Sequence, residues 1–383
     1  MSYYFDHAAT GLPRAQRAIA AATAVINGGS AQRGYHHAAI TAHQIIEEAR
    51  EAIAPLVGTT CQTHSVCFLP STTAALNQVI LGLRPRPSRI ALDPLAHHAT
   101  YRPIIALAQQ QQIPHWILPH NAQGLIDCAQ LTQAWQPETD LVVLTHASNV
   151  TGLVQPVTAV MNVAKRFGAK VVIDAAQSVG VIDTQALGIA DAVAFGGHKG
   201  LSALPGLGVL VINSHTIKLE PIIYGGTGRE SASDTMPDRL PQQLEAGTPN
   251  LPAIAAIAAQ AKAAKKAAKF SKPVVSAHAL REAVLAGGGQ VLSTGEASVV
   301  PVVSFALPDI PHLEAADMLE RCFDIQLRSG LHCAPLAHRT LGTFPHGTLR
   351  VSTGETTTLS DLEHLTQALR GLSQSYLQIH HHA

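Results

Sequence analysis

The sequence predicts an α/β protein with a large domain, built on a mainly parallel seven-stranded sheet between helices, and a smaller α+β domain at the C-terminal end. Three observations support this prediction. The chain has 383 residues, enough for two domains. Short strand-like runs alternate with helical segments over much of its length, as in sheets that helices cover on both faces. From Lys272 onward this alternation gives way to a mixed pattern. We therefore expect an N-terminal segment of residues 1–14 near the small domain, a large domain of residues 15–250 and a small domain of residues 251–383.

The chain opens with an irregular segment, Tyr4–Pro13. In the large domain, Ala38–Leu56 has four apolar residues on one helical face. Seven apolar runs predict strands: Ser65–Leu69, Arg89–Leu92, His115–Leu118, Leu141–Thr145, Val171–Ile173, Ala192–Phe195 and Gly208–Ile212. Helical segments such as Thr73–Leu83 and Thr100–Gln111 lie between most of them. Glycine and proline cluster from Pro221 to Pro252, which is typical of a long functional loop.

The small domain is predicted from a second set of segments. Helices are expected near His278–Ala286, Pro311–Cys322 and Ser360–Gln374, and strands near Val299–Ala306, Ile325–Arg328 and Thr348–Ser352. Ala253–Phe270, next to the boundary, is helical in composition. We see no internal repeat.

Composition narrows the class of protein. Apolar residues make up 46% and charged residues 14% of the chain, which argues against disorder. Lys and Arg balance Asp and Glu at 26 each, so the net charge suggests neither nucleic acid nor a membrane surface as a partner. We find no apolar run long enough to span a bilayer, and the N-terminus does not resemble a signal peptide.

The five cysteines form no C-x-x-C pair and show no metal-ligand spacing. An odd number of this kind favours reduced thiols and a cytoplasmic location, without a metal site. We interpret four of them as small buried apolar residues, namely Cys61, Cys67, Cys128 and Cys322.

An acid and a lysine end two of the predicted strands. Asp174 follows Val171–Ile173, and Lys199 follows Ala192–Phe195 after a Gly-Gly-His turn. Parallel sheets bind ligands at the carboxyl ends of their strands, so both side chains can reach one crevice. A pyridoxal 5'-phosphate (PLP) enzyme needs such a pair, a lysine for the Schiff base and an acid for the pyridine nitrogen. A strand-end acid and a Lys-Gly loop also occur without any cofactor.

Three hydroxyl residues, Ser71, Thr72 and Thr73, begin the helix that follows the first strand. A helix N-terminus offers free N–H groups and a positive dipole end, so this segment can bind a phosphate. Ser and Thr are equally common there as simple N-caps. His97 follows the second strand and can stack on a flat ring, although a loop histidine is often incidental.

Asn149 follows the fourth strand, where its amide can donate to a ligand oxygen or belong to a turn. Gln177 lies three residues after Asp174 and can reach the same ligand. Cys333 lies between Gly330 and Pro335 beside a histidine and near an arginine. This setting favours a nucleophilic thiolate, and the alternative is another buried apolar residue.

Arg350 lies inside a strand-like run. Its planar fork suits either a substrate carboxylate or a structural ion pair.

The order of these signals resembles the cysteine desulfurase branch of the class V aminotransferases, which are PLP enzymes of fold type I. The resemblance covers nearly the whole chain and rests on nine segments: Phe5-Asp6-x-Ala8-Ala9-Thr10, Ser71-Thr72-Thr73, His97-His98-Ala99, Ser148-Asn149-Val150-Thr151-Gly152, Asp174-Ala175-Ala176-Gln177, Gly197-His198-Lys199, Gly225-Gly226-Thr227-Gly228, Glu245–Asn250 and Arg328-Ser329-Gly330-Leu331-His332-Cys333-Ala334. The last segment resembles the short-loop group, which includes the selenocysteine lyases.

The resemblance implies roles for these residues. Lys199 would carry the Schiff base, with Asp174 at the pyridinium nitrogen and His97 stacked on the ring. Asn149 and Gln177 would contact the ring hydroxyl and its surroundings. Thr73 and His198 would hold the phosphate, with Ser71 and Thr72 binding the cofactor at the same helix start and Thr227 reaching in from the second subunit of a homodimer. Arg350, Ala8 and Asn149 would bind the substrate, and Cys333 would take its sulfur as a persulfide.

The chain departs from the family pattern at several positions. His7 replaces an asparagine, Ala96 an acid, Ser71 a glycine and Gly196 a phosphate-binding serine, and Thr357-Thr358 stands where relatives have Asn-Thr. Two of these departures, Ser71 and Gly196, fall in the expected phosphate site, whereas the pair of Asp174 and Lys199 matches the family pattern.

The predicted activity is conversion of L-cysteine to L-alanine, with the sulfur captured on Cys333 for transfer to an acceptor protein. The alternatives are a selenocysteine lyase acting on L-selenocysteine, a class V aminotransferase or cysteine/cystine β-lyase that does not need Cys333, and a sulfur-relay scaffold with a degenerate PLP site.

Overall fold

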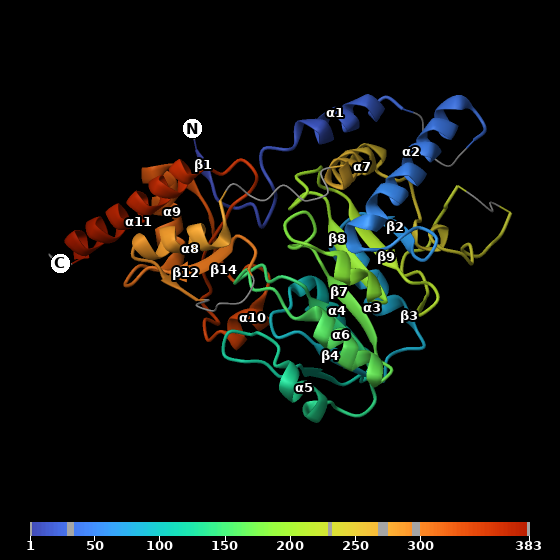
Figure 1. The fold of residues 1–383 in the computed structure, drawn as a ribbon, viewed down its shortest axis with the longest axis horizontal. Coiled ribbons are helices and arrows are strands. Elements are labelled where there is room, and N and C mark those ends of the chain that lie inside the picture. The colour runs from blue at the N-terminus through green and yellow to red at the C-terminus, as the bar shows by residue number, and fades with distance from the viewer. Residues whose placement is uncertain (1, 29–33, 229–231, 267–274, 293–298, 381–383) are drawn as a thin grey trace.

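The computed structural model describes residues 2–28, 34–228, 232–266, 275–292 and 299–380 (Figure 1). Its larger sheet has seven strands in the spatial order β2-β9-β8-β7-β6-β4-β5. The bounds are β2 Ser65–Leu69, β4 Arg89–Leu92, β5 His115–Ile117, β6 Thr139–Thr145, β7 Lys170–Asp174, β8 Ala192–Gly196 and β9 Gly208–Ile212. Strands β4 to β8 pair in parallel, and β9 runs antiparallel to both β8 and β2. The sheet is therefore mainly parallel, as predicted.

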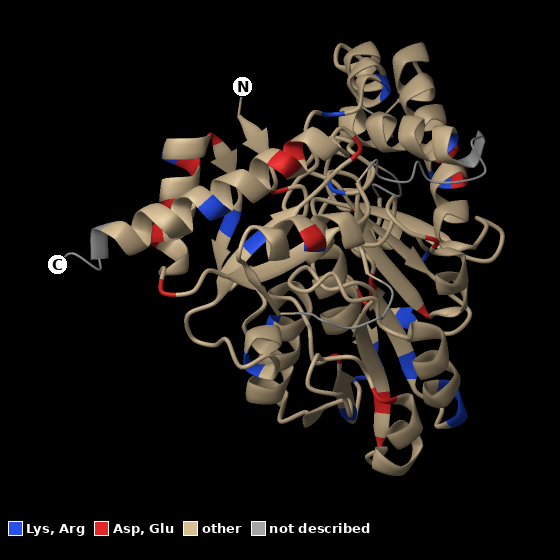
Figure 2. Cartoon of the chain, turned by 60° about the vertical axis from the view of Figure 1, so that its left-hand side comes forward, with Lys and Arg blue, Asp and Glu red and all other residues tan. Residues whose placement is uncertain are grey.

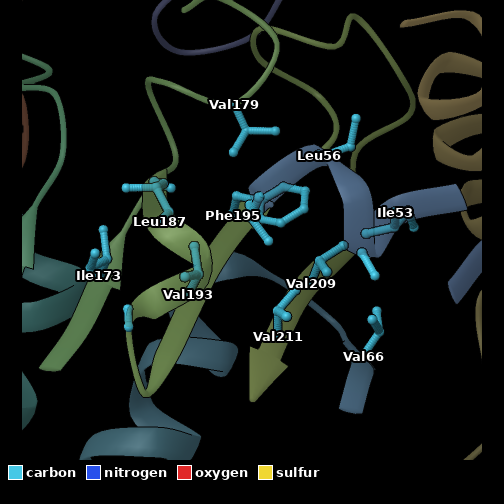
Figure 3. Packing of buried hydrophobic residues seen from close by; sticks show 14 of the residues in the cluster. Ile53, Leu56, Val66, Ile173, Val179, Leu187, Val193, Phe195, Val209 and Val211 are labelled. Atoms are coloured by element: carbon cyan, nitrogen blue, oxygen red, sulfur yellow. The ribbon is translucent and has the colours of Figure 1, made fainter. Parts of the chain in front are cut away.

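Helices cover both faces of this sheet, because its apolar side chains alternate between the faces. In β7, Val171 and Ile173 join one buried cluster, whereas Val172 joins the other. Figure 3 shows part of the first cluster, where Phe195 and Val209 pack near Ile53 at the end of α2. The helices around the sheet are α1 Gln16–Val25, α2 His37–Ile53, α3 Thr72–Gly82, α4 His98–Gln111, α5 Cys128–Ala134, α6 Val157–Arg166 and α7 Leu251–Lys266.

Short elements complete this part of the chain. They are the 3-10 helices η1 Ala54–Val57, η2 Gln185–Ile189 and η3 Gln242–Leu244, and the strand pair β3 Leu83–Arg84 and β10 Lys218–Leu219. Beyond η3, Glu245 pairs with Arg50 at 2.7 Å and accepts a hydrogen bond from the Phe68 amide at 2.6 Å. The glycine- and proline-rich region is thereby attached to the strand that leads into α3.

A second, antiparallel sheet lies apart from the first, with α8, α9 and α11 around it (Figure 1). Its order is β11-β12-β15-β14. The bounds are α8 Ala277–Ala286, β11 Gln290–Val291, β12 Val302–Ala306, α9 His312–Phe323, β13 Ile325–Gln326, β14 Arg328–Gly330, α10 Pro335–Thr340, β15 Thr348–Ser352 and α11 Leu359–His380. The N-terminal strand β1, Tyr3–Tyr4, pairs with β13, so the first residues pack with this smaller unit.

The helix at the expected domain boundary packs with the large unit. Residues of α7 share a buried cluster with α1, α2 and the larger sheet. We therefore propose that the division between the units falls after α7 rather than near residue 250. Part of the predicted helix Ala253–Phe270, residues 267–270, lies outside the described residues.

Two of the cysteine predictions are wrong. Cys67 is buried, but Cys61 and Cys322 are exposed. Cys61 follows η1 in a turn, and Cys322 lies on the outer face of α9, where neither can reach a core. Figure 2 shows acidic and basic residues scattered over a mostly uncharged ribbon. In the part of the chain that the structure describes, no helix combines the length and apolar character needed to cross a membrane.

Candidate active site

A cavity of about 640 Å³, partly open to solvent, lies at the carboxyl ends of β6, β7 and β8. Parallel strands of open α/β sheets bind ligands at this edge. The structure brings together there every residue predicted to bind the cofactor except Thr227. The lining residues are Ser71, Thr72, Thr73, His97, Ala99, Thr145, Ala147, Asn149, Asp174, Ala176, Gln177, His198 and Lys199.

Asp174 and Lys199 reach this cavity from adjacent strands. Asp174 ends β7, in register with Ala194 of β8, and accepts a hydrogen bond from the Ala176 amide at 3.0 Å. Burial raises the pKa of Asp174, and the neighbouring Lys199 opposes this shift. Burial likewise lowers the pKa of Lys199, against the pull of Asp174. The lysine amine is therefore easier to deprotonate than an exposed one, as a nucleophile or base requires.

His97 caps the N-terminus of α4. Its Nδ1 accepts a hydrogen bond from the Ala99 amide at 3.0 Å, which fixes the orientation of the ring. Burial, and then the charge of Lys199, lowers the pKa of His97 to about 3. The imidazole is therefore neutral at pH 7, with its proton on Nε2, and can lie against an aromatic ligand without placing a second cation beside Lys199.

Two hydroxyls at the start of α3, those of Ser71 and Thr72, differ in their hydrogen bonding. Ser71 is the N-cap, and its Oγ accepts a hydrogen bond from the Ala74 amide at 3.1 Å. Thr72 Oγ1 and His198 Nδ1 are buried and have no hydrogen-bond partner among the described residues. Buried polar atoms normally have a partner, so these two atoms favour an anionic ligand at this corner of the cavity.

Cys333 lies on an exposed turn between β14 and α10. His332 and Cys333 both adopt positive φ, 50° and 56°, which non-glycine residues rarely do. The large unit holds this turn by two hydrogen bonds. The Cys333 carbonyl accepts from the His98 amide at 2.7 Å, and the His332 carbonyl accepts from Asn149 Nδ2 at 2.8 Å.

The surroundings of the Cys333 thiol are positively charged. Arg328 Nη2 lies 3.6 Å from Cys333 Sγ, so a thiolate formed there would face a guanidinium. The amide of His98 donates to the Cys333 carbonyl, and His98 directly follows His97, which lines the cavity. The turn is therefore fixed beside the cavity that Lys199 lines.

Arg350 is buried in β15 and is already paired. Its Nη2 lies 2.5 Å from Asp6 Oδ1, and its Nη1 donates to the Asn149 carbonyl at 3.0 Å. Its Nε is buried without a hydrogen-bond partner in the described part of the chain. The structural ion pair that the sequence left open therefore exists, and binding of a substrate carboxylate by Arg350 stays a prediction.

Ala8 lies on the other side of Lys199. Its carbonyl accepts from Gln177 Nε2 at 2.9 Å, and its amide donates to Ser352 Oγ at 2.8 Å. A second cavity of about 540 Å³ lies there, lined by Lys199 and Gln177 together with residues of the N-terminal segment and the smaller sheet. The predicted role of Ala8 in substrate binding is untested.

Comparison with known proteins identifies the family. The sequence profile of the aminotransferase class-V family matches residues 3–365. The chain belongs to the aminotransferase class-V family. Among curated proteins of similar sequence, "Probable cysteine desulfurase" of Pasteurella multocida is 31% identical over 382 residues, covering 96% of this chain and 88% of the relative. The protein of the same name from Vibrio cholerae is 30% identical over 358 residues, covering 90% and 86%.

Solved structures of the family agree with the fold. An apo cysteine desulfurase from Thermococcus onnurineus NA1 has a TM-score of 0.85 at 27% identity, covering 98% of this chain and 95% of that one. The cysteine desulfurase CsdA from Escherichia coli has a TM-score of 0.82 at 26% identity, covering 97% and 95%. The predicted family and the predicted fold are confirmed.

Enzymes of this family generally depend on PLP, and the residues of the cavity fit it. Thr72 Oγ1 and His198 Nδ1 would hold its phosphate, Asp174 its ring nitrogen and His97 its ring face. Lys199, which lines the same cavity, would supply the amine. Two features carry this fit. The unpaired atoms of Thr72 and His198 match the phosphate of PLP, and the buried acid Asp174 matches its ring nitrogen.

Sequence reasoning missed two supports of the class-V site. Arg14 donates to the His198 carbonyl at 2.9 Å and so braces the residue before Lys199. Asp93 is fully buried after β4 and accepts from the amides of Leu95 at 2.6 Å and Thr145 at 3.4 Å. An acid directly after a strand was the signal that identified Asp174, and the same signal marks Asp93. No comparable pattern marks Arg14.

Thr227 does not line either cavity of its own chain. It is buried in the loop that follows β10, on a segment where Ile223 and Tyr224 are exposed, with 51% and 72% of their surfaces accessible. Its predicted contact with the phosphate requires a second subunit and stays a prediction.

Proposed function

We propose that the protein is a cysteine desulfurase that converts L-cysteine to L-alanine and retains the sulfur on Cys333. One observation carries the proposal. The turn of Cys333 is hydrogen-bonded to His98, next to His97, so a thiol nucleophile is held beside the lysine and acid of a PLP-type cavity. An aminotransferase would need Lys199 and Asp174 but would have no use for this thiol. The relatives named cysteine desulfurases support the same reaction.

Bound PLP would supply an electron sink for charge that develops at the substrate Cα. Asp174, raised in pKa by burial but facing a cation, would stabilise the positive end of that sink. Lys199, whose pKa burial lowers, would take the proton from Cα and return one later. His97, neutral and fixed by its hydrogen bond to Ala99, would hold the ring in place.

Sulfur capture uses the thiolate of Cys333. Its sulfur attacks the substrate sulfur, and a sulfur–sulfur bond forms as the substrate Cβ–Sγ bond breaks. The carbon keeps the electron pair and is protonated, so the products are alanine and a Cys333 persulfide. Arg328, 3.6 Å from the thiol, stabilises the thiolate before attack.

The finer features of this function belong to the same proposal. A homodimer would bring Thr227 to the phosphate, and Arg350 and Ala8 would contact the substrate. A sulfur-acceptor protein would collect the persulfide sulfur from the exposed turn. The five free cysteines suit the reducing cytoplasm. A selenocysteine lyase would use the same residues and differ in substrate.

The test is mass analysis of the Cys333 peptide after incubation with L-cysteine and, separately, with L-selenocysteine. We expect a gain of one sulfur atom and one alanine per turnover with L-cysteine. Cys333→Ala should retain PLP and lose the persulfide. Lys199→Ala should lower alanine formation by about 10⁴-fold, and the exposed Lys165→Ala serves as its control. Undiminished sulfur transfer by Cys333→Ala, or pyruvate as the main product, would contradict the proposal.

A further inference from the structure

Two glycines face each other at the ends of β8 and β9, beneath the start of α3. Gly196 and Gly208 are direct partners in the antiparallel register of these strands. A Cβ atom at Gly208 would lie 2.1 Å from the Ser71 carbonyl carbon and 2.6 Å from the Thr72 nitrogen. Backbone atoms cannot yield to such contacts, so Gly208 allows the first turn of α3 to lie directly on the sheet.

Gly196 makes room for side chains rather than for backbone. A Cβ atom there would lie 2.8 Å from Thr72 Oγ1 and 3.1 Å from both Cε1 and Nδ1 of His198. These neighbours include the two buried polar atoms that lack a partner among the described residues. Thr72 and His198 thus converge on the space that a side chain at position 196 would occupy.

A side chain at this position would displace the donors themselves. Thr72 is β-branched and has one torsion with which to move its hydroxyl, so relief of the clash turns Oγ1 away from the cavity. The His198 ring would have to shift as well, although three hydrogen bonds fix its carbonyl. These come from the Gly11 amide at 2.8 Å, Arg14 at 2.9 Å and the Thr10 hydroxyl at 3.3 Å.

The family pattern has a phosphate-binding serine at the position of Gly196. We propose that in this chain Thr72 Oγ1 and His198 Nδ1 bind the phosphate of PLP, and that Gly196 is needed to admit them because it has no side chain. Restoring the serine would therefore weaken cofactor binding rather than improve it. This inference rests on the proposed use of PLP but is independent of sulfur chemistry.

The electrostatics of the corner agree with this assignment. Burial, and then the charges of Lys199 and Arg14, lowers the pKa of His198 to about 4. A neutral imidazole can carry its proton on Nδ1 and donate it to a phosphate oxygen. The amides at the start of α3 add a favourable dipole at the same place.

The experiment measures PLP dissociation constants of the full chain by absorbance titration after the cofactor is removed. Four proteins are compared: the wild type, Thr72→Ala, Gly196→Ser and the double variant. Each single variant should bind PLP about tenfold more weakly, because one hydrogen bond to a charged phosphate is lost. The double variant should bind PLP more tightly than Gly196→Ser alone, since the serine hydroxyl enters the space that Thr72 has left.

Further controls separate an effect on phosphate binding from other causes of weaker PLP binding. Pyridoxal, which lacks the phosphate, should show the same affinity for all four proteins. Thr72→Ser keeps the hydroxyl and should bind PLP as the wild type does. Gly371→Ser, on α11, and the exposed Thr60→Ala should leave both affinities unchanged. Melting of each protein without cofactor identifies variants that misfold.

PLP binding by Gly196→Ser as tight as that of the wild type would overturn the inference, as would additive losses in the double variant. Equal losses for pyridoxal and PLP would also overturn it. Normal PLP binding without a Cys333 persulfide would instead contradict the proposed desulfurase activity and leave the phosphate assignment intact. A wild type that binds no PLP would refute both.

Discussion

Lys199 follows β8, a strand buried on both faces, whereas Cys333 lies on an exposed turn of the smaller unit. The main-chain path to Lys199 is fixed by strand pairing on both sides and by the bonds that hold the His198 carbonyl. The path to Cys333 depends on two left-handed residues and on two hydrogen bonds from the other unit.

The difference separates two parts of the proposed function. Cofactor binding uses groups on a rigid sheet edge, which single substitutions outside the cavity will disturb little. Sulfur capture uses a turn whose position relative to the cavity depends on a few contacts between units. Changes at those contacts should therefore alter persulfide formation more than PLP affinity.

Among changes at the contacts between the units, Asn149→Ala should have the largest effect, and it tests this separation directly. Its Nδ2 is 2.8 Å from the His332 carbonyl, and without it that carbonyl loses its bond to the large unit. We expect persulfide formation to fall by about 10²-fold, because small displacements of a nucleophile are costly. The PLP dissociation constant should rise less than about fivefold. Single-turnover mass analysis and absorbance titration measure the two quantities.

The exposed Asn162→Ala on α6 is the matched control and should change neither quantity. An equal loss of PLP affinity and persulfide formation in Asn149→Ala would show that Asn149 acts mainly on the cofactor. In that case the resemblance to the family, which places Asn149 near the ring hydroxyl, would describe its role better than its bond to the turn.

Acid should destabilise the region of the cysteine turn through two buried histidines, His332 in the turn and His338 on α10. His332 and His338 are buried, and burial is the main cause that lowers the pKa of His332 to about 2 and of His338 to about 4. Arg350, His338 and Arg328 lower the pKa of His332 further, and His312 that of His338. Both rings are thus neutral in the folded state at pH values where the unfolded chain, with a histidine pKa near 6.5, is protonated.

The stability that these two rings provide is present above pH 6.5. It is lost as the pH falls from 6.5 toward about 4 for His338 and toward about 2 for His332. The unfolded state binds more protons there, so the free energy of unfolding should decrease by up to about 1.4 kcal/mol per pH unit for each ring. Urea unfolding at pH 7.5 and pH 5 measures this slope. His338→Gln should make the slope shallower, and the exposed His278→Gln should leave it unchanged. Equal slopes for all three proteins would contradict a neutral His338.

The sheet and the cofactor pair were predictable because their signals are local. Short apolar runs predicted all seven strands, and an acid or a lysine after a run marked Asp174 and Lys199. The exposed position of Cys333 followed from its Gly- and Pro-flanked turn. In each case a few consecutive residues determine the structure.

The contacts that complete the site could not be predicted in this way. Arg350 pairs with Asp6, at the other end of the chain, and Asn149 donates to a carbonyl of the turn. The first pair joins the N-terminal segment to the smaller sheet, and the second joins the two units. No local pattern encodes either contact, because the partners are far apart in the sequence. The role of Gly196 also depends on a neighbour from another segment. The sequence shows that Gly196 lacks a hydroxyl, but only the structure shows that Thr72 Oγ1 lies next to it.

Ser71→Ala should have the smallest effect and separates the cap of α3 from its phosphate site. Ser71 Oγ accepts a hydrogen bond from the Ala74 amide at 3.1 Å, and its neighbour Thr72 carries the hydroxyl without a partner among the described residues. Loss of an N-cap should lower the free energy of unfolding by about 1 kcal/mol, measured by urea unfolding of the protein without cofactor. PLP affinity should stay within about twofold of the wild type, because the side chain that binds the phosphate is unchanged. Ser71→Asn, another good cap, should restore the stability. A loss of PLP affinity in Ser71→Ala as large as that in Thr72→Ala would contradict this separation. Ser71 would then bind the phosphate as well, although its Oγ already accepts a hydrogen bond from the Ala74 amide.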